Sequence, residues 1–146
     1  MKIKMITVLL FICFVSASIP VNKGYAYVDK PLQQQSEKQY KDIISSLLMP
    51  HIFKSVSDYY SKLLTEVPLV DPWDIEYLSV ERPNDLFEFV VKVKVLPYVG
   101  SHLDVGTDII TITVEGTGEV IINKFEHIKS SYLSLPDNWQ HIIKRT

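Results

Sequence analysis

The sequence predicts an α+β fold in which an N-terminal helix packs on a four-stranded antiparallel meander as two layers. Apolar residues recur at helical spacing in the first half of the chain and alternate with polar residues in the second half. No helix-length connection separates the expected strands, which excludes parallel β-α-β units. The 146 residues, 47% of them hydrophobic and 22% charged, suffice for one domain with a core.

The N-terminus has the three parts of a secretory signal peptide. Lys2 and Lys4 precede an apolar run over residues 5–17, and Gly24 and Ala26 supply small residues before a cleavage site. We therefore expect cleavage after Ala26 and a protein that is secreted or associated with the cell surface. The apolar run is shorter than the about 20 residues that a spanning helix needs. An uncleaved anchor is the alternative.

The predicted organisation has three parts. They are a signal peptide over 1–26, a flexible lead over 27–35 and a single α+β domain over 36–146. The only cysteine, Cys13, lies in the first part, where it is expected to be a buried apolar residue, with lipidation as the alternative. The mature chain therefore has no disulfide, thiol nucleophile or cysteine zinc site.

The charge balance also limits the classes of partner. Fifteen basic and seventeen acidic residues give a net charge of −2, and removal of the three lysines of the signal peptide changes it to −5. A chain without a basic surface is not expected to bind nucleic acid. No spanning membrane segment is expected in the mature chain.

The helix is expected to start at a capping box, in which the Ser36 hydroxyl accepts a backbone N–H and Gln39 reaches back. Pro50 falls within the apolar stripe, so the helix is either kinked there or split into two. Pro68 and Pro72 end it. The stripe comprises Tyr40, Ile43, Ile44, Leu47, Leu48, Ile52, Val56, Tyr59, Tyr60, Leu63 and Leu64.

The strands follow from alternation of apolar and polar residues. The expected strands are 75–80, 86–96, 110–114 and 119–128. Phe87, Phe89, Val91, Val93 and Val95 share one face of the second strand, which predicts one buried and one wet side. Residues 82–85 and 115–118 form turns, residues 98–107 a loop, and a short helix follows Pro136.

The connecting loop carries the first group of candidate functional residues. His102 and Asp104 could hold a metal ion or act as an oriented base. The interpretation we favour is a strand-connecting turn in which Asp104 and Asp108 bond backbone N–H groups and Gly106 supplies a positive φ. We therefore assign no metal ligand.

A second group surrounds Trp73. Asp71, Asp74 and Glu76 could form a cation or sugar site with the indole as its platform. The simpler interpretation is a loop with solvated acids. His51 could pair with His127 or Glu126, although a single hydrogen bond at the edge of the core is the expected role of such a histidine.

Several unusual strings resemble a family of small exported proteins of unknown function from spore-forming Gram-positive bacteria. These strings are 47–52, 59–60, 68–72, 79–83, 97–102, 105–108 and 124–127, and the resemblance covers 42–128. The resemblance implies a bacterial exported protein and brings no activity, substrate or site residue.

The function predicted from the sequence is therefore a non-catalytic, exported binding or interaction module of the bacterial cell surface or medium, with no cofactor. No nucleotide-binding, zinc-protease or serine-hydrolase motif is present. An envelope protein or polymer is the candidate partner. The candidate binding residues are Trp73, Tyr98, His102, Asp104 and Asp108. The alternative is a small metal-dependent or His/Asp-based hydrolase in which His102 and Asp104 converge with His51 or His127.

Overall fold

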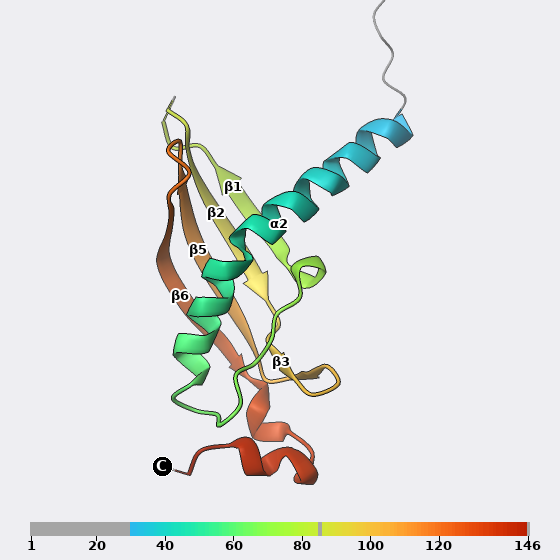
Figure 1. Ribbon diagram of the computed structural model, residues 1–146, viewed down its shortest axis with the longest axis vertical. Helices are drawn as coiled ribbons and strands as arrows, with labels where there is room; N and C mark the ends of the chain where they lie inside the picture. The colour runs from blue at the N-terminus through green and yellow to red at the C-terminus, as the bar shows by residue number, and fades with distance from the viewer. Residues whose placement is uncertain (1–29, 85, 146) are drawn as a thin grey trace, which may run out of the picture. The chain divides into compact units, whose positions relative to one another are not determined.

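The structure is a computed structural model that describes residues 30–84 and 86–145. One long helix is followed by a four-stranded antiparallel sheet, so the predicted α+β fold is confirmed (Figure 1). The helices and 3₁₀ turns are α2 (Lys30–Tyr60), η1 (Pro72–Asp74), η2 (Ser131–Ser134) and η3 (Asp137–Ile142). The strands are β1 (Glu76–Glu81), β2 (Glu88–Val95), β3 (Tyr98–Val99), β4 (Leu103–Asp104), β5 (Gly106–Glu115) and β6 (Val120–Ser130). The predicted signal peptide lies outside the described residues.

Helix α2 differs from its prediction at both its start and its proline. It already includes Lys30, so Ser36 lies inside the helix and is not its N-cap. Pro50 lies within the same continuous helix, so a split into two helices is wrong. Proline removes only the donor to the carbonyl of Ser46, and one lost bond does not end a helix held by its packing. A kink at Pro50 stays a prediction.

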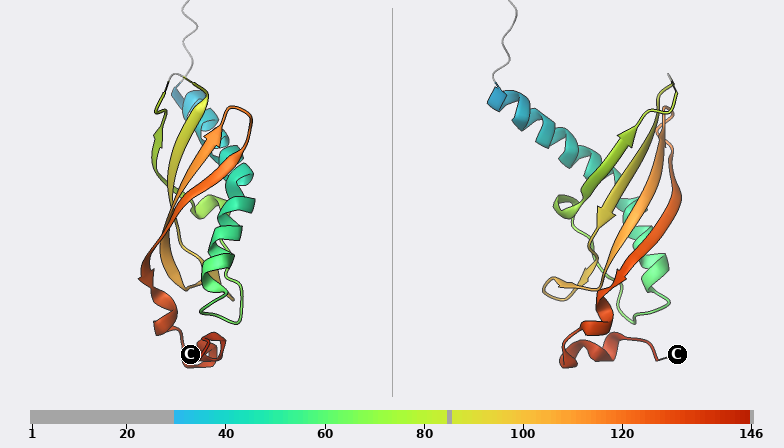
Figure 2. Two further views of the ribbon diagram at one scale, coloured as in Figure 1. Left: turned by 90° about the vertical axis from the view of Figure 1, so that its left-hand side faces the viewer. Right: turned by 180° about the vertical axis from the view of Figure 1, so that it is seen from behind.

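Only the C-terminal half of the predicted apolar stripe is buried. Leu48, Ile52, Val56 and Tyr60, each four residues apart, are at most 2% exposed. The earlier stripe residues Tyr40, Ile43, Ile44 and Leu47 are exposed. The C-terminal half of α2 lies along the strands (Figure 2), which explains why burial of the apolar stripe starts at Leu48. Within 30–84 and 86–145 no helix is long and apolar enough to cross a membrane.

The sheet has the order β1-β2-β5-β6, with every neighbouring pair antiparallel. Val95 of β2 pairs with Asp108 of β5, and Asp108 pairs in turn with His127 of β6. The register of β5 against β6 shifts between Thr107 and Asp108. This irregularity lies beside the buried polar network described below.

The buried face of the sheet and the buried half of α2 contribute to one hydrophobic cluster. Val91, Val93 and Val95 alternate with less buried residues, as predicted for β2. Phe87 was expected on the same face, but it precedes the strand and is exposed. The two-layer packing stays a prediction.

The segment predicted as a loop between β2 and β5 contains a small hairpin formed by β3 and β4. Its turn has positive φ at Gly100 (54°) and at His102 (60°). Gly106 does not have a positive φ, so that detail of the turn interpretation is wrong. Gly106 is instead the first residue of β5, and its lack of a side chain serves a packing role described below.

The C-terminal tail forms η2 and η3 and pairs with the segment that follows α2. Ile142 is fully buried, and its carbonyl accepts the backbone N–H of Thr65 at 2.7 Å. The N–H of Lys144 donates to the carbonyl of Leu63 at 2.8 Å. The short helix predicted after Pro136 is therefore a 3₁₀ helix.

Candidate functional site

Two groups of polar residues carry the chemistry of the described chain. The first, called the surface cluster below, consists of Asp71, Asp74 and His102. One ligand atom from each lies within 4.8 Å of the other two. Two carboxylates and an imidazole at this spacing attract a cation and offer the donor types that bind zinc.

A short backbone pairing assembles the surface cluster from two separate segments. Leu69 and Tyr98 exchange backbone hydrogen bonds of 2.8 and 2.9 Å, which places the start of η1 beside the β3–β4 hairpin. The ring of His102 stacks on that of Tyr98, with centroids 4.2 Å apart. His102 adopts a left-handed backbone conformation that is uncommon outside glycine. The hairpin turn therefore holds the imidazole in place against Tyr98.

Asp71 gives the surface cluster an unsatisfied acceptor. Its Oδ2 is buried and has no hydrogen-bond partner among the described residues, and Nδ1 of His102 lies 3.9 Å away. Burial, together with the negative charges of Asp71 and Asp74, raises the pKa of Tyr98, so its phenol stays neutral. A buried carboxylate oxygen without a donor is costly, and a cation would relieve that cost.

Trp73 lies between the two aspartates in sequence, and 73% of its surface is exposed. Two other predicted members of this region lie elsewhere. Glu76 forms an ion pair with Lys94 of the neighbouring strand. Asp104 is exposed and pairs with Tyr98 in the β3–β4 ladder, but it is not part of the surface cluster.

The second group is a buried hydrogen-bond network around Asp108. This carboxylate has no exposed surface, and its Oδ1 lies 2.7 Å from Nδ1 of His127. Its Oδ2 accepts the hydroxyl of Tyr60 at 3.0 Å. On the other side of the imidazole, Nε2 lies 2.8 Å from Oγ of Ser130. Asp108 therefore bonds to side chains from α2 and β6, and it is not a member of the surface cluster.

The pKa directions in this network follow from burial. Burial raises the pKa of Asp108, while the hydrogen bonds from His127 and Tyr60 work in the opposite direction. Burial and the adjacent Asp108 raise the pKa of Tyr60 far above its ordinary value. Tyr60 is therefore a neutral phenol that donates to Asp108.

Gly106 makes room for this network. A Cβ atom at this position would collide with the hydroxyl of Tyr60 and would lie 2.9 Å from the carbonyl of Lys129 and 3.1 Å from Cε1 of His127. The backbone carbonyl cannot move aside without disturbing the β5–β6 pairing. Glycine is therefore required here for close approach rather than for backbone conformation.

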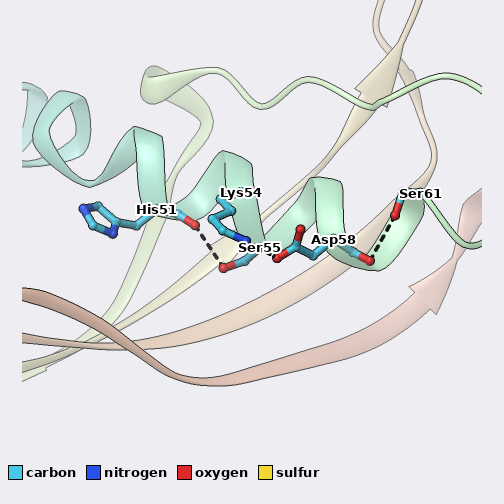
Figure 3. Close-up of polar contacts among 5 residues, drawn as sticks. All are labelled: His51, Lys54, Ser55, Asp58 and Ser61. Atoms are coloured by element: carbon cyan, nitrogen blue, oxygen red, sulfur yellow. Dashed lines mark hydrogen bonds and ion pairs between the residues drawn. The ribbon is translucent and has the colours of Figure 1, made fainter.

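His51 does not join the network. It contributes its backbone carbonyl to Oγ of Ser55 at 2.9 Å, and its ring points away from the other labelled residues of α2 (Figure 3). Both ring nitrogens of His127 are already bonded to Asp108 and Ser130, so the pairing of His51 with His127 is not formed. Among the described residues, the group that could hold a metal ion contains His102 but not Asp104, His51 or His127. The convergence predicted for the hydrolase alternative is therefore not present in that group.

Sequence reasoning missed the roles of Tyr60 and Ser130. Tyr60 was assigned to the apolar stripe, where its ring does belong, and Ser130 follows the predicted end of the last strand. One feature of the sequence could have revealed the buried network. Asp108 is a charged residue in phase with Ile110 and Ile112, which lie on the buried face of β5. A carboxylate at such a position needs buried donors.

Comparison with known protein families matches residues 40–129 to a family described as "Protein of unknown function (DUF3888)". The chain belongs to this family. The match includes the surface cluster, Asp108 and His127, and it ends one residue before Ser130. The resemblance to a family of unknown function is thereby confirmed, and no curated protein or solved structure matches the chain.

Replacing Tyr60 with phenylalanine tests the buried network. The Tyr60→Phe variant keeps the ring but leaves Oδ2 of Asp108 without its donor, so we expect the free energy of unfolding to fall by about 1–3 kcal/mol. The matched control is Tyr59→Phe, one residue earlier on α2, which we expect to change it by less than about 0.5 kcal/mol. Urea unfolding followed by circular dichroism measures both. Equal losses in the two variants would contradict a stabilising role of the Tyr60–Asp108 hydrogen bond.

Proposed function

We propose that the protein is an exported binding module that recognises a cationic group on a partner in the bacterial cell envelope. The observation that carries this proposal is that Oδ2 of Asp71, beside Asp74 and His102, has no hydrogen-bond partner within residues 30–84 and 86–145. Membership of a family of unknown function is compatible with it and adds no activity. Export rests on the predicted signal peptide, with cleavage after Ala26.

The chemistry of the surface cluster favours a cation over other ligands. Two carboxylates provide negative charge, and an ammonium or guanidinium group can donate to a carboxylate oxygen that lacks a partner. The exposed indole of Trp73 offers an aromatic face for the same kind of group. A basic side chain of an envelope protein, or an amino group of an envelope polymer, has this chemistry.

Export is tested by the intact mass of the full-length protein expressed in a Gram-positive host. We expect a species in the culture medium or at the cell surface whose mass corresponds to a chain starting at Tyr27. A product of full-length mass in the membrane fraction would contradict cleavage and support the anchor.

Binding is tested by titrating the purified protein with an oligolysine peptide and following the indole Nε1–H resonance of Trp73 by NMR. We expect a saturable shift, weakened at least about tenfold in an Asp71→Asn/Asp74→Asn variant, because the carboxylates supply the attraction. The control is Asp137→Asn, which removes an exposed carboxylate from η3.

An unchanged affinity in the double variant would overturn the proposed site. A shift that zinc or calcium chloride produces and the peptide does not would also overturn the cationic-partner proposal, since it would identify a metal-ion site. An oligoglutamate peptide of the same length tests charge selectivity, and equal binding of the two peptides would contradict the proposal.

A further inference from the structure

We propose that Ser130, His127 and Asp108 form a nucleophile–base–carboxylate triad that hydrolyses carboxylic esters. This inference goes beyond the binding function and concerns a different site. It also departs from the non-catalytic role predicted from the sequence. The hydrolase alternative of the sequence used His102 and Asp104, neither of which takes part here.

The hydrogen bonds follow the order that nucleophilic catalysis requires. Oγ of Ser130 lies 2.8 Å from Nε2 of His127, and Nδ1 of the same ring lies 2.7 Å from Oδ1 of Asp108. A carboxylate on Nδ1 holds the proton on that nitrogen, which leaves Nε2 free to accept the serine proton. Such a triad is recognised by geometry and roles rather than by sequence order.

Exposure increases along the triad toward the nucleophile. Asp108 is fully buried, the side chain of His127 is 16% exposed, and Ser130 is partly exposed at the end of β6. The carboxylate is thus shielded from water, where it orients the imidazole most effectively, while the hydroxyl can meet a substrate.

The surroundings fix the carboxylate and the imidazole. The hydroxyl of Tyr60 donates a hydrogen bond to Oδ2 of Asp108, which fixes the orientation of the carboxylate. The ring of Tyr59 stacks on His127 with centroids 4.8 Å apart.

The reaction is balanced by one ester and one water. Oγ of Ser130 attacks the carbonyl carbon while its proton passes to Nε2 of His127. The tetrahedral intermediate expels the alcohol, which takes that proton, and an acyl-serine remains. Water then attacks the acyl-serine, gives a proton to His127 and releases the carboxylic acid, with the proton returning to Oγ.

The aromatic surface beside His127 indicates the substrate class. A shallow depression of about 350 Å³ is lined by Ser55, Asp58, Tyr59, Lys62 and Phe125. Tyr59 stacks on both Phe125 and His127, so the apolar wall of the depression adjoins the base. Such a wall suits a short apolar acyl group. Esters are easier to hydrolyse than amides, because an alkoxide is a better leaving group than an amide nitrogen. We therefore expect esters as the substrate class.

The test is covalent labelling of the full chain with a fluorophosphonate probe, located by tandem mass spectrometry, together with hydrolysis of p-nitrophenyl butyrate. We expect the label on Ser130 and hydrolysis at least about 10²-fold above buffer.

The variants separate catalysis from folding. Ser130→Ala and His127→Gln should each lose labelling and hydrolysis while retaining the circular dichroism spectrum of the parent. Ser134→Ala, which removes an exposed hydroxyl in η2, should retain both activities.

An unlabelled Ser130 in folded parent protein would overturn the proposal, and so would hydrolysis that persists in Ser130→Ala. The Ser130→Ala variant should bind oligolysine as tightly as the parent protein does. Failure of the triad proposal is therefore distinguishable from failure of the proposed binding function.

Discussion

A carboxylate without exposed surface lies where the end of α2 meets the sheet, and the local structure depends on satisfying both of its oxygens. Asp108 receives one donor from the helix, through Tyr60, and one from β6, through His127. An unpaired carboxylate at this depth would be strongly destabilising. The carboxylate therefore ties three elements to one relative position. Gly106 lacks a side chain because that position is filled by the hydroxyl of Tyr60.

The two candidate sites are both next to the connection between β2 and β5. The hairpin inserted there carries Tyr98 and His102 toward Asp71, and β5 starts directly afterwards at Gly106 and reaches Asp108 two residues later. One short stretch of chain thus supplies an exposed, acidic cluster and a buried network with different chemistry. In the first, Oδ2 of Asp71 receives no donor from the part of the chain that the structure describes, whereas both oxygens of Asp108 are hydrogen-bonded.

The regular elements could be predicted because their periodicity is local. The alternation of apolar and polar residues in β2 correctly predicted which face of the strand is buried. The four-residue spacing from Leu48 to Tyr60 did the same for α2. The exposure of Ile43 and Leu47 could not be predicted, since periodicity does not reveal where the partner sheet ends. Residues 30–35 are polar and contain a proline, which predicts a flexible lead. They are helical instead, so the predicted start of α2 was too late.

The sites were less predictable because they depend on contacts distant in sequence. His102 and Asp71 were both noted as candidates, but only the pairing of Leu69 with Tyr98 brings them together. Selective ¹⁵N-histidine labelling and long-range ¹H–¹⁵N NMR test whether Asp108 holds His127 in one tautomer. We expect the tautomer of His127 that carries its proton on Nδ1, because Asp108 accepts from that nitrogen. A proton on Nε2, or a mixture of both tautomers, would contradict it.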